Sequence, residues 1–371
     1  MQFIDLKTQQ DRIREKIEIN IKNVLDHGKY IMGPEIKELE EKLAKYCGVK
    51  HAIGVASGTD ALLIPLMAYG IEPGDAVFTT PFTFIATAEV IQLLGATPVF
   101  VDIDPETFNI DTDKLEDVIK RTIEEGKLNP RGILPVDLFG QTADYDPINE
   151  IAKKYDLFVL EDAAQSFGAT YNNSKAGSLA NVASTSFFPA KPLGAYGDGG
   201  MIFTDNDDLH QKMLSIRVHG SGLDKYNNTR VGLNGRLDTI QAAVLLAKFE
   251  IFDEEIKLRQ IVAKRYNDEL KETVKIPFVE SYNVSAWAQY AMLHSDRDKI
   301  VDNLKTDGVP VAIYYPIPLH LQEAFSHLSY NKGDFPVSEK SADQIFSVPF
   351  HPYLTKNDQD KVIGSIKSAI L

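Results

Sequence analysis

The chain has a single cysteine, Cys47, among its 371 residues, so it cannot form an intrachain disulfide bond. A chain without disulfides is typical of a reducing compartment, and we expect the protein to be cytoplasmic. The sequence also lacks any apolar run of the roughly 20 residues that a membrane-spanning helix needs. Its first stretch, MQFIDLKTQQDRIREKI, is charged and amphipathic, unlike a signal peptide. No membrane association is therefore expected.

Basic residues are in the minority. The 39 lysines and arginines are outnumbered by 53 aspartates and glutamates, and the formal net charge is −14. We do not expect nucleic acid as a partner, because contacts with phosphates need clustered basic side chains. An anionic small substrate would have to be held by a local basic pocket, because the overall charge of the protein repels it.

Several common site motifs are absent. There is no HExxH, no CxxC and no GxxxxGK[ST], and the glycine-rich GAYGDGG does not follow the GxGxxG order of a dinucleotide site. The eight histidines are scattered without ligand spacing, so we expect no metal site. What the chain does contain, 44% hydrophobic and 25% charged residues, is typical of a soluble globular protein with a sizeable core.

Short apolar runs alternate with amphipathic stretches between residues 50 and 205, which predicts an α/β fold with a mainly parallel sheet flanked by helices. We expect residues 1–236, with an N-terminal helix, to form a large domain and residues 277–371 to form a smaller α+β domain. Residues 237–276 contain neither Gly nor Pro and have helical periodicity, which predicts a long connecting helix, straight or bent, because the stretch is too long for one ordinary helix. The strand-like runs are HAIGVA, DAVFTT, TPVFVDI, GILPVDLF, LFVLED, ASTSFF and GGMIFTD.

Lys191 has the most unusual setting of the lysines, in the segment SFFPAKPLGAYGDGG. Pro189 and Pro192 stiffen the turn around it, and the glycines that follow allow the backbone to approach closely. A lysine that is fixed in this way is suited to attack a carbonyl and form a Schiff base. The alternative is an ordinary surface lysine in a loop.

Three further features follow strand-like runs. Gly58 and Thr59 open a helix after HAIGVA, where free amides and a hydroxyl can hold a phosphate, although a plain helix cap is the alternative. Asp162 ends LFVLED, where its carboxylate can face a protonated ring nitrogen or cap the next helix. Phe84 follows DAVFTT, where its ring can stack on a flat cofactor or pack in the core.

These features together match the needs of one cofactor. A phosphate cradle, a ring platform, a carboxylate for a ring nitrogen and an amine for an aldehyde are what pyridoxal 5'-phosphate requires. Each feature alone has an ordinary structural explanation. Their combination predicts an enzyme that depends on pyridoxal phosphate.

Longer segments point to a family. The chain contains, in this order, FIDLKTQQ, YIMGPEIKELEEKLAKYCGVKHAIGVASGTDAL, TPFTFIATAEVIQLLGATPVFVDID, EDAAQSFGA, SFFPAKPLGAYGDGG, GLNGRLDTIQAA, YYPIPLH and SVPFHPYLT. Over essentially its full length it resembles the fold-type-I, pyridoxal-phosphate-dependent nucleotide-sugar aminotransferases of the DegT/DnrJ/StrS family. The resemblance implies a fold-type-I large domain, a small C-terminal domain and a homodimer with shared active sites.

The resemblance also implies roles for individual residues. Lys191 matches the Schiff-base lysine that shuttles protons, where the family's sugar dehydratases carry His instead. Asn234 matches the Asn of the GxNxR motif, which reaches the phosphate in the neighbouring subunit. The other residues implied at the cofactor are Asp162 at the pyridine nitrogen, Gln165 at the ring hydroxyl, Phe84 over the ring, and Gly58, Thr59 and Ser186 at the phosphate.

The segments FIDLKTQQ, FGQTADYDPIN, RVGLNGRLDTIQAA and YPIPL are most similar to one subgroup, the UDP-2-acetamido-2-deoxy-3-oxo-glucuronate aminotransferases of bacterial surface-polysaccharide synthesis. In that subgroup an Arg and a His-Tyr pair lie at the carboxylate of the sugar. Arg236 and Tyr315 match, whereas Tyr314 stands where His is expected and cannot carry a positive charge. The alternative for Arg236 is an ion pair with Asp238.

The resemblance thus implies the transfer of an amino group from L-glutamate to the keto carbon of a nucleotide-linked sugar, in the synthesis of a lipopolysaccharide O-antigen. A dTDP- or UDP-linked keto-6-deoxyhexose is the alternative acceptor. A regulator that binds the cofactor without turnover is the alternative from another class. The presence of Lys191, Asp162 and Gln165 argues against the regulator.

Overall fold

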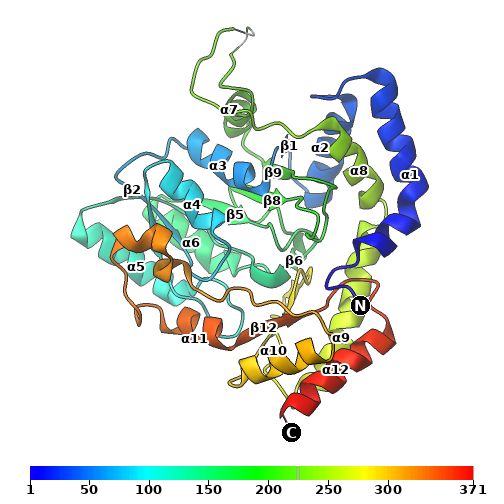
Figure 1. Ribbon diagram of the computed structural model, residues 1–371. Coiled ribbons are helices and arrows are strands. Elements are labelled where there is room, and N and C mark those ends of the chain that lie inside the picture. Colours follow the sequence, from blue (N-terminus) through cyan, green and yellow to red (C-terminus); the bar gives the residue numbers. More distant parts are fainter. Residues whose placement is uncertain (223, 225, 371) are drawn as a thin grey trace.

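The structure is a computed structural model that describes residues 1–222, 224 and 226–370 (Figure 1). At its centre lies a seven-stranded sheet in the order β1-β9-β8-β5-β4-β2-β3. Only β9 runs antiparallel to its neighbours, so the predicted mainly parallel sheet is confirmed. The strands are β1 (His51–Val55), β2 (Asp75–Thr79), β3 (Thr97–Phe100), β4 (Asn129–Ile133), β5 (Phe158–Asp162), β8 (Val182–Ser186) and β9 (Gly200–Thr204).

Helices cover both faces of this sheet, as the alternating pattern predicted (Figure 1). One face packs against α3 (Gly58–Ala68), α4 (Ala86–Leu93) and α7 (Asp207–Arg217). The other packs against α2 (Pro34–Cys47), α5 (Thr112–Glu125), α6 (Tyr145–Tyr155) and α8 (Thr239–Phe249). Because successive side chains of a strand point to opposite faces, each strand contributes to both cores.

The stretch 237–276, expected to be one long connecting helix, is divided. Helix α8 is followed by α9 (Phe252–Leu270), and Ile251 between them has non-helical dihedral angles, with φ −107° and ψ 0°. The break lets Phe249 and Phe252 both contact the ring of Tyr46, with centroid distances of 5.3 and 5.9 Å. The aromatic contacts at this point replace the continuous helix that periodicity alone predicts.

The C-terminal part has a core of its own, formed by α9, by the antiparallel strands β11 (Tyr290–Leu293) and β12 (Ile345–Val348), and by α10 (Arg297–Thr306) and α12 (Lys356–Ile370). A three-stranded sheet links β10 (Asn283–Val284), β6 (Thr170–Tyr171) and β7 (Ser174–Lys175). Helix α11 (Pro336–Gln344) precedes β12. The two cores match the expected division into a large and a small part, and the boundaries at 236 and 277 stay predictions.

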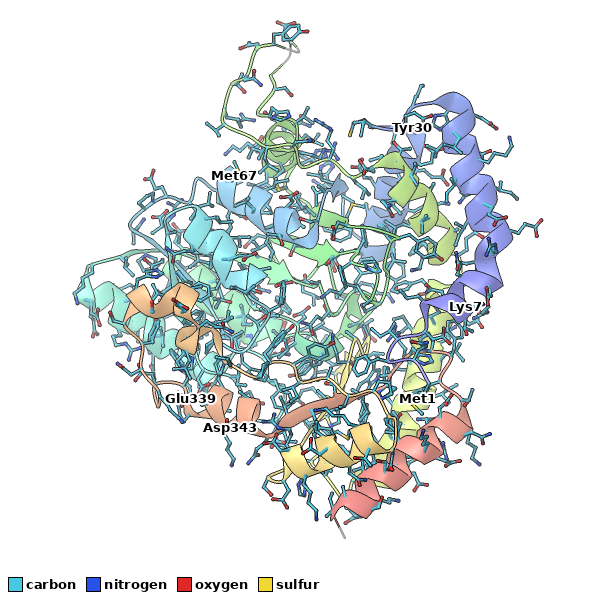
Figure 2. All side chains as sticks on the ribbon, viewed as in Figure 1. Met1, Lys7, Tyr30, Met67, Glu339 and Asp343 are labelled. Atoms are coloured by element: carbon cyan, nitrogen blue, oxygen red, sulfur yellow. The ribbon has the colours of Figure 1, made fainter. Side chains whose placement is uncertain are left out.

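The N-terminal segment joins both parts. Helix α1 (Leu6–His27) packs along α8, and Figure 2 shows Lys7 and Tyr30 at opposite ends of it. Before α1, the carbonyl of Phe3 accepts a hydrogen bond of 3.1 Å from the amide of Phe350, which brings Met1 next to the C-terminal part (Figure 2). No helix within the described residues is long and apolar enough to cross a membrane.

Candidate active site

The start of α3 and the end of β8 meet closely. A Cβ atom added to Gly58 would lie 2.6 Å from Cβ of Ser186, so only glycine allows this approach. Ser57 caps the helix by accepting a hydrogen bond of 3.0 Å from the amide of Asp60. The amides of Gly58 and Thr59, the first two helix residues, have no partner in the helix. The helix is therefore capped, and it still offers two amides and the nearby hydroxyls to an anion.

Lys191 lies in the connection between the neighbouring antiparallel strands β8 and β9. The connection is closed at its base, where the amide of Phe187 donates to the carbonyl of Gly199 and the amide of Ala195 donates to the carbonyl of Phe187, both at 2.8 Å. The amide of Lys191 itself donates to the carbonyl of Phe188 at 2.9 Å. The lysine is thus held in a tight turn, not on a helix surface.

Asp162 ends β5 and is 5% exposed. Its carboxylate accepts hydrogen bonds from Thr87 Oγ1 at 2.9 Å and from the amide of Ala164 at 3.2 Å. Burial raises the pKa of Asp162, and these two bonds and the charge of Lys191 oppose the rise. Burial lowers the pKa of Lys191, and the charge of Asp162 opposes that fall. The site therefore pairs a buried carboxylate with an amine that loses its proton more readily than a surface lysine.

These groups fit pyridoxal 5'-phosphate. The glycine cradle at Gly58 offers amides to a phosphate, and Ser186 lies beside it. Asp162 supplies a carboxylate in a buried setting, where a protonated ring nitrogen would compensate its charge. Lys191 supplies a buried amine for the aldehyde.

Gln165 and Phe84 complete this side of the site. The side chain of Gln165 accepts a hydrogen bond of 2.8 Å from the amide of Phe139 and donates one of 3.2 Å to Tyr315 Oη. The ring of Phe84 is 55% exposed and lies 6.5 Å from that of Tyr315, whereas Phe82, two residues before it, is fully buried. Phe82 thus takes the core position, and Phe84 remains free to face a ligand.

Tyr314 and Tyr315 belong to residues 313–321, which we call the acceptor loop. Its start is paired with β12 through two bonds between Ala312 and Ser347, of 2.8 and 3.1 Å. Near its end, the amide of Leu319 donates to the carbonyl of Pro81 at 2.7 Å. Next to it, His320 Nε2 donates to Glu339 of α11 at 3.1 Å. The loop is therefore attached at its start to the small domain and near its end to the segment that carries Phe84.

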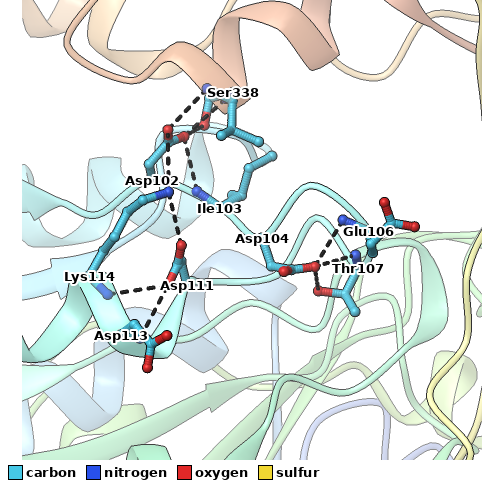
Figure 3. Close-up of polar contacts among 10 residues, drawn as sticks. Asp102, Ile103, Asp104, Glu106, Thr107, Asp111, Asp113, Lys114 and Ser338 are labelled. Atoms are coloured by element: carbon cyan, nitrogen blue, oxygen red, sulfur yellow. Dashed lines mark hydrogen bonds and ion pairs between the residues drawn. The ribbon is translucent and has the colours of Figure 1, made fainter.

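Helix α11 is capped from the large domain by Asp102, which follows β3 (Figure 3). The carboxylate accepts bonds from the amides of Val337 and Ser338, both at 3.0 Å, and from Ser338 Oγ at 2.7 Å. The helix's own N-cap residue, Phe335, has no side-chain acceptor. Because α11 also carries Glu339, Asp102 determines where the acceptor loop is held.

Asn234 and Arg236 lie in a separate cavity of about 410 Å³, which Ile31, Asp198 and Gln241 also line. Nε of Arg236 is buried without a hydrogen-bond partner, and no ion pair joins its guanidinium to Asp238 or to another described residue. The alternative of a pair with Asp238 is therefore not what the structure contains. Asn234 is exposed, and Lys191 is not among the residues that line this cavity.

Sequence reasoning missed Thr87 and Asp102. Thr87 lies in the quoted segment FIATAEV, but a threonine in an apolar helix carries no signal until its partner Asp162 is placed beside it. Asp102 follows the apolar run TPVFV directly, as Asp162 follows LFVLE. A buried carboxylate at a strand end was thus a usable signal in both places. Among the described residues, no three His, Cys, Asp or Glu side chains gather to hold a metal ion.

Comparison with known proteins agrees with this geometry. Residues 11–367 match the DegT/DnrJ/EryC1/StrS aminotransferase family. The chain is 51% identical to the UDP-2-acetamido-2-deoxy-3-oxo-D-glucuronate aminotransferase of Pseudomonas aeruginosa, over 95% of this chain and 96% of that protein.

Solved structures of the same family superpose on this chain over nearly its full length. A DegT DnrJ EryC1 StrS aminotransferase from Brucella abortus superposes with a TM-score of 0.98 at 50% identity, covering 100% of this chain and 99% of the other. NtdA from Bacillus subtilis, with bound cofactor PMP, has a TM-score of 0.89 at 30% identity, covering 99% and 83%. With the lysine, the carboxylate and the phosphate cradle in place, the chain belongs to the DegT/DnrJ/EryC1/StrS family and is a sugar aminotransferase that uses pyridoxal phosphate.

Proposed function

We propose that the protein transfers an amino group from L-glutamate to the 3-keto carbon of UDP-2-acetamido-2-deoxy-3-oxo-glucuronate, for a bacterial surface polysaccharide such as an O-antigen. The observation that carries this choice of sugar is the unpaired Arg236 in its cavity. A guanidinium grips a carboxylate through two parallel hydrogen bonds, which a neutral sugar cannot use. The similarity to the P. aeruginosa aminotransferase supports the same acceptor.

We propose that the active enzyme is a homodimer in which Asn234 and Arg236 serve the partner's site. Asn234 is exposed, and apolar side chains surround this face: Tyr30, Ile31 and Met32 are 49%, 50% and 44% exposed. The bridge between Ile31 and Asp238 brings them beside Arg236. A second copy that covers this face would bury the apolar side chains and bring both polar residues to a ligand.

The residues of the chain have separate roles in this reaction. The bound cofactor supplies an aldehyde and an electron-withdrawing ring, which allow nitrogen to move between two substrates. Lys191 Nζ would hold the cofactor at its aldehyde, and as a free amine it would take up and return the proton that moves in the reaction. Its lowered pKa increases the neutral fraction of the amine that can accept the proton. The carboxylate of Asp162 would keep the ring nitrogen protonated, and Gln165 would orient the ring by a hydrogen bond to the ring hydroxyl.

Tyr314 and Tyr315 are proposed to face the sugar. Tyr315 is held by Gln165, so its position is tied to that of the cofactor. Tyr314 is half-buried and contacts Phe3 with a centroid distance of 6.4 Å. Burial raises the pKa of Tyr314, so it would meet the sugar as a neutral hydrogen-bond donor. The positive charge at the sugar acid would then come from Arg236 alone.

The test runs the reaction in reverse. Purified protein with pyridoxal phosphate is offered UDP- and dTDP-linked amino sugars together with 2-oxoglutarate, and glutamate is measured. We expect glutamate from the UDP-linked 3-amino glucuronate, and little from the 3-amino sugar with a neutral hydroxymethyl group at the same position. The Lys191→Ala variant is the background control.

The other outcomes are equally informative. Preference for a dTDP- or UDP-linked amino-6-deoxyhexose would contradict the acid and identify a deoxy sugar as the acceptor. No transfer with any sugar or with glutamate alone would favour the regulator that binds the cofactor without turnover. Light scattering at the working concentration tests the dimer, and a monomer with full activity would contradict the shared site.

A further inference from the structure

Two further buried carboxyl groups, those of Asp137 and Glu161, lie on the face of the sheet opposite to Asp162. Val136 is paired with Asp162 in parallel register, so Asp137 and Glu161 both point to the opposite face. Both side chains are fully buried. The amide of Asp137 also donates to the carbonyl of Asp162 at 3.1 Å, so the two positions are joined through the backbone.

Asp137 connects the two segments that hold Gln165. One oxygen accepts bonds from the amide of Ala143 at 2.9 Å and from Tyr145 Oη at 3.0 Å, which closes the turn that contains Phe139. The other accepts a bond of 2.6 Å from Ser166 Oγ. Gln165 precedes Ser166 and accepts its own bond from Phe139. One carboxyl group thus holds both the turn that carries Phe139, a partner of the Gln165 side chain, and Ser166, the residue that follows Gln165 in the chain.

The side chain of Glu161 is also fixed by hydrogen bonds. Its two oxygens accept bonds from the amides of Gly177 at 2.6 Å and Leu179 at 3.0 Å. Burial and the charge of Asp137 both raise the pKa of Glu161, because two buried carboxylates on the same face of the sheet repel each other when both are ionised. No described lysine, arginine or histidine forms an ion pair with either. A proton is therefore the means of neutralising this pair.

We propose that Asp137 is a positioning residue of the cofactor site, which holds Gln165 in place and retains one proton in common with Glu161 behind Asp162. Its effect on Gln165 rests on the proposed function, whereas the shared proton does not. The titratable groups that face Asp137 are Tyr145 from α6 and Glu161 from β5, and the charge of Asp162 acts on it from the opposite face of the sheet.

The direction of the pKa shifts of both carboxyl groups supports the proposal. Burial raises the pKa of Asp137 to about 7, and the charge of Asp162 acts in the same direction, whereas the bonds from Ser166, Ala143 and Tyr145 oppose it. Burial also raises the pKa of Glu161. A carboxyl group whose folded pKa lies above its unfolded value of about 4 makes the protein less stable as the pH rises between these two values. Above about pH 7 this loss of stability is complete.

The first experiment measures melting temperatures of the full-length protein between pH 5 and pH 8.5, with and without pyridoxal phosphate. Asp137→Asn keeps the shape and the acceptor oxygen but cannot ionise. We expect its melting temperature to exceed that of the wild type by a margin that grows up to about pH 7 and is constant above it. Asp146→Asn, a change at an exposed carboxylate next to Tyr145 on α6, is the matched control and should run parallel to the wild type.

A second variant removes a bond without removing a charge. Because the Ser166 hydroxyl lowers the pKa of Asp137, Ser166→Ala should move the end of the pH-dependent range to higher pH. The same variant should bind pyridoxal phosphate several-fold more weakly, measured as a dissociation constant by equilibrium dialysis, because Gln165 loses one of its supports.

The outcomes separate the parts of the proposal. A constant difference between Asp137→Asn and wild type at all pH values would overturn the shared proton. Wild-type cofactor affinity in Ser166→Ala would overturn the positioning role. The melting experiment without cofactor stays valid if the proposed function fails, so the two failures can be told apart.

Discussion

The cofactor side and the acceptor side of the site are held in different ways. Asp162, Gln165 and Lys191 lie on or shortly after strands of one sheet, and each has hydrogen bonds within the large domain, with one further bond from Gln165 to Tyr315. The acceptor loop has little regular structure, and hydrogen bonds attach it to the small domain and to the loop before α4. The comparison indicates that the positions of the cofactor-side groups depend on the sheet, whereas those of Tyr314 and Tyr315 depend on how the C-terminal part is attached.

The largest effect expected is on the cofactor side. Lys191→Ala should abolish turnover of glutamate, and borohydride should attach pyridoxal phosphate to the Lys191 peptide of the wild type but not to the variant. Lys212→Ala, at an exposed position on α7, is the control and should behave as wild type. Turnover of glutamate by Lys191→Ala at the wild-type rate would show that the mechanism is wrong.

Asp162→Asn should lose transamination by several orders of magnitude and remain folded. Asparagine can still accept the bond from Thr87, but it carries no charge to keep the ring nitrogen protonated. Single-turnover rates with glutamate measure the loss, and circular dichroism controls for folding. A loss of only tenfold, about 1.4 kcal/mol, would reduce Asp162 to a helix cap.

The Arg236→Ala variant tests the proposed binding of the acceptor sugar. Loss of a charged hydrogen-bonding partner should raise KM for the UDP-linked sugar acid by about 10- to 100-fold, and much less for a hydroxymethyl or 6-deoxy analogue. Asp238→Ala is the matched control, because it would have an equal effect if Arg236 acted by pairing with Asp238. Equal losses with charged and neutral sugars would remove the carboxylate argument.

Asp102→Asn tests the attachment of the small domain. Asparagine keeps one acceptor but loses the charge at the start of α11, so we expect KM for the acceptor to rise roughly three- to tenfold. Cofactor affinity and the rate with glutamate should not change. Asp111→Asn, which affects the cap of α5 nearby, should change neither KM value (Figure 3). Equal changes for glutamate and sugar in Asp102→Asn would mean that the two sides are not held separately.

Tyr314→His should have the smallest effect. The new side chain becomes cationic as the pH falls towards the ordinary pKa of histidine, about 6.5, so the sugar acid should bind more tightly at pH 6 than at pH 8. The ratio of KM values at the two pH values measures this, with the wild type as control. A ratio unchanged from that of the wild type would place Tyr314 away from the carboxylate.

The fold was predictable because its strands are short, apolar and separated by turns. Six of the seven runs that were expected as strands correspond to β1, β2, β3, β5, β8 and β9, whereas the run GILPVDLF overlaps β4 only at Gly132 and Ile133. The length of residues 237–276 allowed for a bend, but its position at Ile251 was not predictable, since the rings around it pack on Tyr46, which lies far away in the sequence. Periodicity describes one helix at a time, and it does not include the partner that bends it.

The candidate site was predictable to a similar degree. Lys191 and Asp162 were predicted from local rules, and the structure places their charges close enough to shift each other's pKa. Asp102 and Ser338 are 236 positions apart, and only the assembled fold shows that one caps the helix of the other. The assignment of Asn234 and Arg236 to a partner's site stays a prediction, because it involves a second chain.

The closed base of the connection that carries Lys191 has a consequence for motion. Ser186 and Gly200 are paired on the last rung between β8 and β9, so the loop leaves the sheet and returns to it at the same place. Such a loop cannot open without breaking backbone hydrogen bonds between β8 and β9, which both have a neighbouring strand on each side. The amide hydrogens of Phe187 and Ala195 should then exchange with solvent only when the large domain unfolds as a whole. The reactive lysine would thus lie on one of the slowest-exchanging loops of the molecule.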